Sequence, residues 1–144
     1  MAKYFKSYRP LIMGQNGAVA TNHPQATLVG MDVLRSGGNA ADAAVAVSLA
    51  LGVVEPCMSG LGGDGFYHVW NAKKKHSTVF NGTGPAPKNS SKDDFLKTGV
   101  AVEGRLSIST PGMVGGLSAM HRANGTLSWR KVCQPAANLA DKGF

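Results

Sequence analysis

Residues 40–54 constrain the fold of this chain more than any other segment, because nearly all of them are Ala, Val or Leu. Asn39 just before them is a typical helix N-cap, and Asp42 stands where a carboxylate can face the unpaired amides of the first turn. Pro56 ends the helix, since proline disfavours helical geometry in the residue before it. A helix without a polar face must be covered on most sides. We therefore expect this helix at the centre of the core.

The other segments predict a mixture of helices and short strands. Helices are expected at residues 24–36, about 113–122 and 129 to about 142, with a short helical turn near 93–96. Strands are expected at 17–21, 66–70, 77–80 and 105–109, and residues 71–76 form the turn of a hairpin. This order indicates an α/β (α+β) fold in which strands lie beside buried helices. A few strands around one very apolar helix make a poor closed domain, so we expect more polypeptide after Phe144.

Length and composition indicate one globular domain or a large piece of one: the chain has 144 residues, 43% hydrophobic and 16% charged. Its formal charge of +7 raises the question of nucleic-acid binding. The 15 Lys and Arg are scattered along the sequence, however, without an aromatic RNA-binding motif, a basic helix or zinc-finger spacing. We expect no nucleic-acid partner.

The N-terminus is polar and basic without an apolar signal segment, and the longest apolar run is too short to cross a bilayer. The sequence as written therefore predicts a cytoplasmic protein that does not associate with membranes. Cys57 and Cys133 are far apart and lack C-x-x-C spacing, so both are interpreted as free structural thiols, with Cys57 buried at a helix end.

The segment Gly60-Leu-Gly-Gly-Asp-Gly65 matches the G-x-G-x-x-G pattern of dinucleotide-binding proteins. That pattern needs a strand before it and a helix after it, and here a helix precedes and a strand follows. A tight turn in which backbone passes close to backbone is the better interpretation of the glycines. Asp64 in this turn is expected to bond to nearby amides rather than act as an acid. No cofactor is expected.

A search for a self-contained active site finds none. The four histidines (His23, His68, His76 and His121) are isolated and lack metal-ligand spacing, so no metal site is expected. Ser59 lacks the flanking glycines of a nucleophile elbow. No histidine or basic group can be assigned to activate Cys57. The residues alone predict a soluble α/β piece with no catalytic residue of its own.

Several uncommon strings in consistent order resemble the start of the large subunit of gamma-glutamyltransferases. The longest are 17–26 (GAVATNHPQA), 33–44 (VLRSGGNAADAA), 51–56 (LGVVEP) and 59–66 (SGLGGDGF). Shorter matches follow at 85–87, 109–112, 116–117, 125–129, 135–136 and 140–144. The resemblance covers nearly the whole chain from Arg9 onward, and it is more specific than any single motif above.

The resemblance implies an N-terminal-nucleophile hydrolase, an α-β-β-α sandwich that would be incomplete in this chain. Residues 1–16 would be an N-terminal extension and 17–144 the N-terminal portion of the large subunit. In this family the precursor cleaves itself, and the new N-terminal Thr of the small subunit attacks an amide, using its α-amino group as the base. Such a group has an ordinary pKa of about 7.7 to 8.0, so no histidine is needed.

That nucleophilic Thr lies beyond Phe144 in such proteins, so the resemblance implies no catalytic residue in this chain and an inactive fragment when it is alone. Its implied partners are the rest of the large subunit, the small subunit and a small-molecule amide, either a gamma-glutamyl compound such as glutathione or a related acyl compound. No cofactor is implied. The family is commonly exported, in contrast to the cytoplasmic location that the N-terminus predicts.

One substrate-binding position can be carried over from the family. In glutamyl-specific members an Arg shortly before the Ala-Pro of the loop after the hairpin holds the substrate α-carboxylate, a task suited to a planar two-pronged cation. This chain reads Asn81-Gly-Thr-Gly-Pro-Ala-Pro87, with Thr83 in the place of that Arg. A neutral Thr cannot make the charge-assisted contact, which puts gamma-glutamyl specificity in doubt.

Three hypotheses follow. The first is the N-terminal part of a gamma-glutamyltransferase-like amidase or acyltransferase that forms an acyl-Thr intermediate. Within the same family, a non-glutamyl acylase or amidohydrolase is the alternative substrate class. The second hypothesis is a truncated, inactive chain, and the third is a dinucleotide-binding module, which the order of elements around residues 60–65 disfavours.

Overall fold

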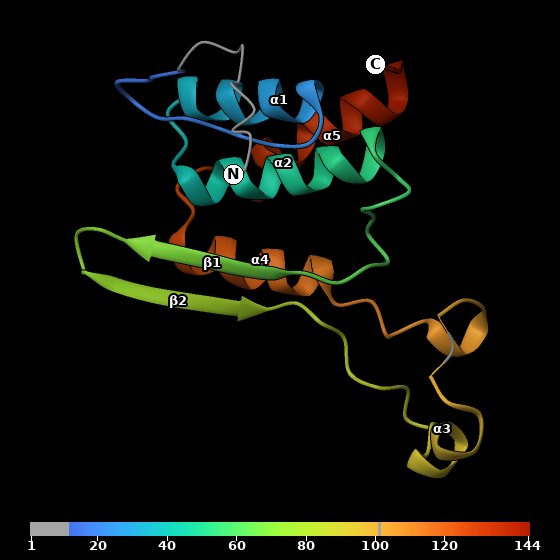
Figure 1. Ribbon diagram of the computed structural model, residues 1–144. Helices are drawn as coiled ribbons and strands as arrows, with labels where there is room; N and C mark the ends of the chain where they lie inside the picture. The colour runs from blue at the N-terminus through green and yellow to red at the C-terminus, as the bar shows by residue number, and fades with distance from the viewer. Residues whose placement is uncertain (1–11, 101) are drawn as a thin grey trace, which may run out of the picture.

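The computed structural model describes residues 12–100 and 102–144 of the chain. Its elements follow in the order α1 (Pro24–Arg35), α2 (Ala40–Val54), β1 (Phe66–Asn71), β2 (His76–Asn81), α3 (Lys92–Thr98), a 3-10 helix (Arg105–Ser107), α4 (Met113–Asn124) and α5 (Trp129–Lys142). In Figure 1, α1, α2 and α5 form one layer above the β1–β2 hairpin, and α4 runs behind the strands. None of the helices in the described residues is long and apolar enough to cross a membrane.

Helix α2 begins with the cap that its sequence predicts. The side-chain oxygen of Asn39 accepts hydrogen bonds from the amides of Ala41 (2.9 Å) and Asp42 (3.1 Å). The Asp42 carboxylate accepts in return from the Asn39 amide at 2.9 Å, which completes a capping box. Both residues satisfy amides that a helix start leaves unpaired.

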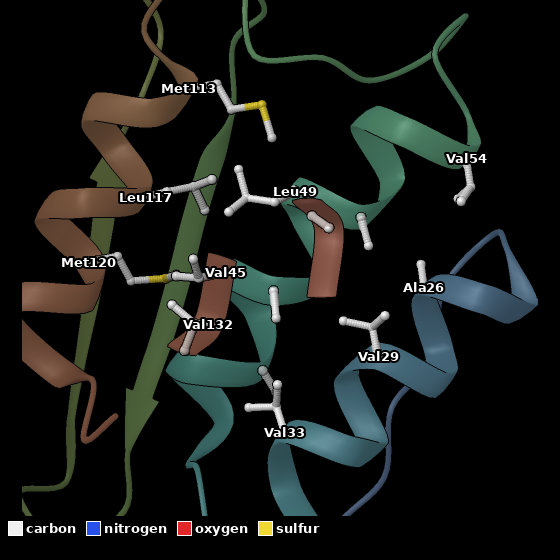
Figure 2. Packing of buried hydrophobic residues seen from close by; sticks show 14 residues of the cluster. Ala26, Val29, Val33, Val45, Leu49, Val54, Met113, Leu117, Met120 and Val132 are labelled. Atoms are coloured by element: carbon white, nitrogen blue, oxygen red, sulfur yellow. The ribbon is translucent and has the colours of Figure 1, made fainter. Parts of the chain in front are cut away.

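The core surrounds α2, as predicted. Figure 2 shows side chains of α2 lying between those of α1 on one side and those of α4 and α5 on the other. Leu117 of α4 and Val132 of α5 are fully buried in this cluster. The larger buried members are Val29, Val33, Val45, Leu49, Val54, Met113, Leu117, Met120 and Val132. Burying a side chain of this size stabilises a fold by about 1.5–3 kcal/mol.

The hairpin is antiparallel, with Tyr67 opposite Phe80 and Val69 opposite Thr78. Tyr67, Val69 and Phe80 pack on the core cluster, whereas Phe66 and Trp70 on the other face of β1 are largely exposed. This alternation is the period-2 pattern of a strand covered on one face only. The lysine-rich turn between the strands is exposed, as expected of a solvated tip.

Two predicted strands are absent. Residues 17–21 form no strand in the described part of the chain, and residues 105–109 contain a 3-10 turn instead. In the latter, both the amide (3.1 Å) and the hydroxyl (2.7 Å) of Ser107 donate to the carbonyl of Gly104. An alternating sequence forms a strand only when the edge of another strand supplies hydrogen-bond partners. At residues 105–109, the local turn at Ser107 takes the place of such a partner.

The remaining helix and hairpin predictions are confirmed to within about two residues at each end, the usual uncertainty of helix ends. Of the predicted N-terminal extension, residues 1–11 lie outside the described residues, while residues 12–16 are exposed. The prediction that Cys57 is buried is wrong, because its thiol is exposed in the turn after α2. Cys133 is half-buried, and burial raises the pKa of its thiol.

Candidate functional site: a glycine-rich junction

Three segments far apart in the sequence meet beside the end of the hairpin: residues 63–65, residues 81–84 and residues 109–113. The Gly82 amide donates to the Gly65 carbonyl at 2.8 Å. The amides of Gly112 (3.2 Å) and Met113 (3.0 Å) both donate to the Gly63 carbonyl. These backbone hydrogen bonds hold the turn before β1, the loop after β2 and the start of α4 together. We call this place the junction.

Glycine is required at the junction because backbones touch there. A Cβ on Gly84 would lie 1.4 Å from the carbonyl oxygen of Thr110, and one on Gly112 would lie 2.3 Å from that of Gly82. Neither backbone could accommodate a side chain without moving. Such an approach was expected for the 60–65 turn itself. There, an added Cβ on Gly63 would lie 3.2 Å from the Gly60 carbonyl oxygen and one on Gly65 would lie 2.5 Å from the Tyr67 hydroxyl, whereas those on Gly60 and Gly62 would meet nothing within 4 Å. The close approach is therefore real but lies mainly in the loops that meet this turn.

Helix α2 precedes the 60–65 turn and strand β1 follows it. This is the order predicted from the sequence, and it is the reverse of the strand–glycines–helix order in which a dinucleotide pyrophosphate meets a helix N-terminus. The glycines at 60, 62 and 65 therefore lack the order of elements that the dinucleotide-binding pattern needs.

Asp64 links all three segments of the junction. One carboxylate oxygen accepts from the Gly84 amide at 3.1 Å, and the other accepts from the Ser109 hydroxyl at 2.7 Å. The hydrogen bonds from Ser109 and then Gly84 hold the pKa of Asp64 below its ordinary value, because they favour the charged carboxylate. Asp64 was predicted to bond to nearby amides of its own turn; the structure instead gives it the amide of Gly84, 20 residues away in the sequence. Its partner Ser109 had no signal in the sequence, because the pair is 45 residues apart.

Thr83, the predicted substrate-binding residue, lies between Gly82 and Gly84 of the junction, and its side chain is exposed. Its amide donates to the side-chain oxygen of Asn81 at 2.8 Å, which closes a local turn. The loop is thus held on both sides of Thr83, by Asn81 before it and Asp64 after it. An exposed side chain on a braced loop is suited to contact a ligand or another part of the protein.

Tyr67 supports the junction from the hairpin side. Its hydroxyl donates to the Met113 carbonyl at 3.3 Å. Burial, together with the negative charge of Asp64, raises the pKa of Tyr67 above its ordinary value, so the hydroxyl keeps its proton.

The expectation that all four histidines are isolated is corrected for His23, His68 and His121. Nε2 of His68 contacts the Ser77 hydroxyl on the exposed surface of the hairpin. His121 is buried, and its Nε2 lies 3.2 Å from the Asp42 carboxylate without forming a hydrogen bond. The ring of Trp129 meets it edge-on at 5.3 Å. His23 instead caps α1, accepting from the Gln25 amide at 3.2 Å. Within residues 12–100 and 102–144, no group of three or more His, Cys, Asp or Glu is placed to hold a metal ion.

Asp42 is the other carboxylate that joins distant segments. Besides the Asn39 amide, it accepts from the Thr126 amide (3.1 Å), the Thr126 hydroxyl (2.7 Å) and the Leu127 amide (3.2 Å). Burial raises the pKa of Asp42, but hydrogen bonds from Asn39, Thr126 and Leu127 outweigh it and hold the pKa below its ordinary value. The carboxylate is fully buried and ties the α4–α5 connection to the start of α2, which is a structural task.

The sequence and the fold of this chain match those of known proteins. A sequence profile described as gamma-glutamyltranspeptidase matches residues 26–144, which is most of the chain. The chain belongs to the gamma-glutamyltranspeptidase family. It is 40% identical to the glutathione hydrolase proenzyme of Bacillus subtilis (strain 168), a match that covers 99% of this chain and 25% of that protein. It is 38% identical to the Escherichia coli (strain K12) glutathione hydrolase proenzyme, over 92% of this chain and 24% of the relative.

Solved structures of the family share the fold. The Helicobacter pylori gamma-glutamyltranspeptidase superposes with a TM-score of 0.83 at 34% identity, over 94% of this chain and 40% of that one. The cephalosporin acylase from Bacillus halodurans superposes with a TM-score of 0.87 at 32% identity, over 99% of this chain and 27% of that one. The expected fold class is confirmed: the chain is an incomplete part of the α/β sandwich of the N-terminal-nucleophile hydrolases. It spans about a quarter of the length of the curated relatives it matches.

Proposed function

We propose that this chain is the N-terminal part of an amidase or acyltransferase that works through an acyl-Thr intermediate, with the Thr supplied by polypeptide outside these 144 residues. Membership of the gamma-glutamyltranspeptidase family supports this reaction class. Among the described residues, the Ser77 hydroxyl contacts Nε2 of His68 on the exposed surface of the hairpin, and family membership rather than this pair supports the proposed reaction. The 144-residue chain alone is expected to be inactive towards amides.

We further propose that the junction forms a wall of the acyl pocket and that Thr83 faces the acyl group. The supporting observation is the exposed Thr83 side chain on a loop braced by Asn81 and Asp64. A braced loop loses little conformational freedom when a ligand binds, which favours binding. The negative Asp64 beside it disfavours a substrate carboxylate.

The preferred substrates follow from this charge pattern. Without the Arg of glutamyl-specific relatives, a free α-carboxylate in the pocket would lose a charge-assisted, two-pronged hydrogen bond. We therefore expect acyl groups without an α-carboxylate to react better than gamma-glutamyl groups. The structural likeness to a cephalosporin acylase agrees with a non-glutamyl substrate class.

The test uses the complete polypeptide that contains these residues, purified and checked for self-cleavage into two chains. Turnover of a gamma-glutamyl anilide is then compared with that of a simple acyl anilide carrying the same leaving group, in the wild type and in Thr83→Arg. A restored charge-assisted contact corresponds to about 1.5–3 kcal/mol, so kcat/KM for the gamma-glutamyl anilide should rise at least about tenfold. The acyl anilide should not gain.

Thr83→Gln is the matched control, because it lengthens the side chain without adding a charge, and it should not raise gamma-glutamyl turnover. Rapid gamma-glutamyl turnover by the wild type would contradict the proposed specificity. Failure of the complete polypeptide to cleave itself and to turn over either anilide would contradict the proposed reaction.

A further inference from the structure

The sequence contains three Asn-Gly steps, at residues 16–17, 81–82 and 124–125. An asparagine before a glycine can react with its own backbone, because the glycine amide nitrogen can attack the carbonyl carbon of the asparagine side chain. Glycine favours this attack, since it has no Cβ to obstruct the approach. The attack requires an amide nitrogen that is free of other partners and a side chain that can turn towards it. The fold therefore decides which of the three steps can react.

The step at 81–82 is held closed at the end of β2. The Gly82 amide, which would have to attack, donates to the Gly65 carbonyl at 2.8 Å. The side-chain oxygen of Asn81 accepts from the Thr83 amide at 2.8 Å, so the group that would be attacked is also engaged. Gly82 is buried as well. Both hydrogen bonds would have to open before this step could react.

The step at 124–125 is held closed at the end of α4. The Gly125 amide donates to the His121 carbonyl at 2.6 Å. The side-chain NH2 of Asn124 donates to the Met120 carbonyl at 3.2 Å. Asn124 and Gly125 are both half-buried. Here too, the attacking nitrogen and the attacked amide each have a partner.

The step at 16–17 is open. Asn16 lies in a bend, and both Asn16 and Gly17 are exposed. Within the part of the chain that the structure describes, neither the Asn16 side chain nor the Gly17 amide takes part in a hydrogen bond. Neither residue belongs to a helix or a strand, so the bend can change shape without breaking regular structure.

We propose that Asn16 is a site of spontaneous deamidation in the folded protein and that the fold protects Asn81 and Asn124. A hydroxide ion removes the proton of the Gly17 amide, and the electron pair of that nitrogen forms a bond to Cγ of Asn16. The bond between Cγ and Nδ2 breaks, and Nδ2 leaves as ammonia after taking protons from water. The product is a cyclic imide. This chemistry does not depend on which amide, if any, the protein cleaves as an enzyme.

Water then opens the imide at one of its two carbonyl carbons. Attack at Cγ breaks its bond to the Gly17 nitrogen and leaves an ordinary aspartate at position 16. Attack at the main-chain carbonyl carbon breaks the original peptide bond instead, so the chain continues through Cγ as isoaspartate. Water is the only co-reactant that either outcome needs.

Both products change the surface around position 16. Each replaces a neutral amide by a carboxylate, which lowers the formal charge of +7 by one. Asn16 and Arg35 line the same hollow of about 430 Å³. Arg35 pairs with Asp32 at 3.0 Å, and because both side chains are exposed this pair is weak. The new carboxylate can therefore compete with Asp32 for the guanidinium.

The experiment follows the complete polypeptide that contains these residues, kept folded at neutral and at mildly alkaline pH. Peptide mapping by mass spectrometry measures the replacement of NH by O at each asparagine, and enzymatic methylation measures isoaspartate. We expect Asn16 to convert at least about tenfold faster than Asn81 and Asn124, because these two react only when the local structure opens. Conversion of Asn16 should be faster at alkaline pH, since hydroxide starts the reaction.

A parallel incubation in urea separates the effect of the fold from that of the local sequence. Unfolding removes the hydrogen bonds at 81–82 and 124–125, so conversion at all three steps should become similar. In the folded state, Asn16→Gln should remove most of the isoaspartate. Asn89→Gln, at another exposed asparagine that serine follows, is the matched control and should leave the isoaspartate unchanged.

Three results would overturn the proposal. The first is conversion of Asn16 in the folded protein that is no faster than conversion of Asn81 or Asn124. The second is an Asn16 that stays intact in the folded protein over a period in which it converts in urea. The third is an Asn16→Gln variant that forms as much isoaspartate as the wild type.

Discussion

Replacing Asp42 by Asn is the most informative perturbation of the fold. The substitution keeps the shape of the side chain but turns one acceptor oxygen into an NH2 donor. Asp42 lies at 0% exposure and accepts from the amides of Asn39, Thr126 and Leu127 and from the Thr126 hydroxyl. An asparagine at this position cannot satisfy all four donors.

The expected loss of stability follows from the number of buried donors that lose their acceptor. Whichever way the new amide is oriented, its NH2 faces either the Asn39 amide or the Leu127 amide, and that donor loses its acceptor. The Thr126 amide reaches both carboxylate oxygens and keeps one acceptor in either orientation. A buried donor without a partner costs about 1–3 kcal/mol. The Thr126 hydroxyl can rotate and accept from the new NH2, which limits the damage. We expect the free energy of unfolding to fall by about 1–3 kcal/mol, a large share of the roughly 5–15 kcal/mol of a typical domain.

The assay is urea unfolding followed by far-UV circular dichroism, with Asp32→Asn as the control. Asp32 lies on the surface of α1, where its ion pair with Arg35 (3.0 Å) joins two exposed side chains. Such a pair contributes about 0–1 kcal/mol, so the control should unfold close to the wild type. Equal midpoints for Asp42→Asn and Asp32→Asn would refute the reasoning that the buried carboxylate holds α2 to the α4–α5 connection.

The same variant tests the pH dependence. The pKa of Asp42 in the folded chain lies below its ordinary value of 3.8, so its contribution to stability is fully present above pH 3.8. That contribution is lost as the pH falls through the folded pKa. The stability difference between wild type and Asp42→Asn should therefore narrow below about pH 3.8. Asp64 is present in both proteins, so its own titration cancels in the difference. A difference that widens in acid would contradict the assignment.

Two further pairs of substitutions test packing, each with urea unfolding as the measurement. Gly84→Ala should destabilise the chain by about 1–3 kcal/mol, because its Cβ would lie 1.4 Å from the carbonyl oxygen of Thr110. The control, Gly115→Ala, adds a Cβ with nothing within 4 Å and should stabilise α4 by about 0.5–1 kcal/mol. A stabilising Gly84→Ala would contradict the described junction. Leu117→Ala, at 0% exposure, should lose about 2–5 kcal/mol, and Val114→Ala, at 40% exposure on the same helix, clearly less; similar losses would place Leu117 outside the core.

Helices and the hairpin could be predicted from the sequence because their signals are local. Asn39 and Asp42 lie at the start of the helix that they cap. The lysine-rich turn joins two strands that are only a few residues apart in the sequence. Hydrogen bonds within a helix or a tight hairpin join near neighbours in the chain, so residue types at short spacing suffice to indicate them. The same local signals failed at residues 17–21 and 105–109, because a strand also needs a partner edge that no local pattern reveals.

The candidate site was only partly predictable. Thr83 came from a family resemblance. Turn chemistry predicted that Asp64 accepts from an amide, but not that the amide is that of Gly84, 20 residues away. Ser109 as the second partner of Asp64, and His121 beside Asp42, could not be found in this way, since no spacing rule relates residues 45 or 79 positions apart.

The sequence by itself determined the helices, the hairpin, the apolar centre of the core and the family to which the chain belongs. These features depend on hydrogen bonds and side-chain periodicity within short segments, or on strings of residues that can be compared directly. The folded structure was needed to show that Asp42 and Asp64 join distant loops and that backbones touch at Gly84 and Gly112. Those outcomes depend on which surfaces pack against each other, a property of the whole folded chain rather than of any one segment.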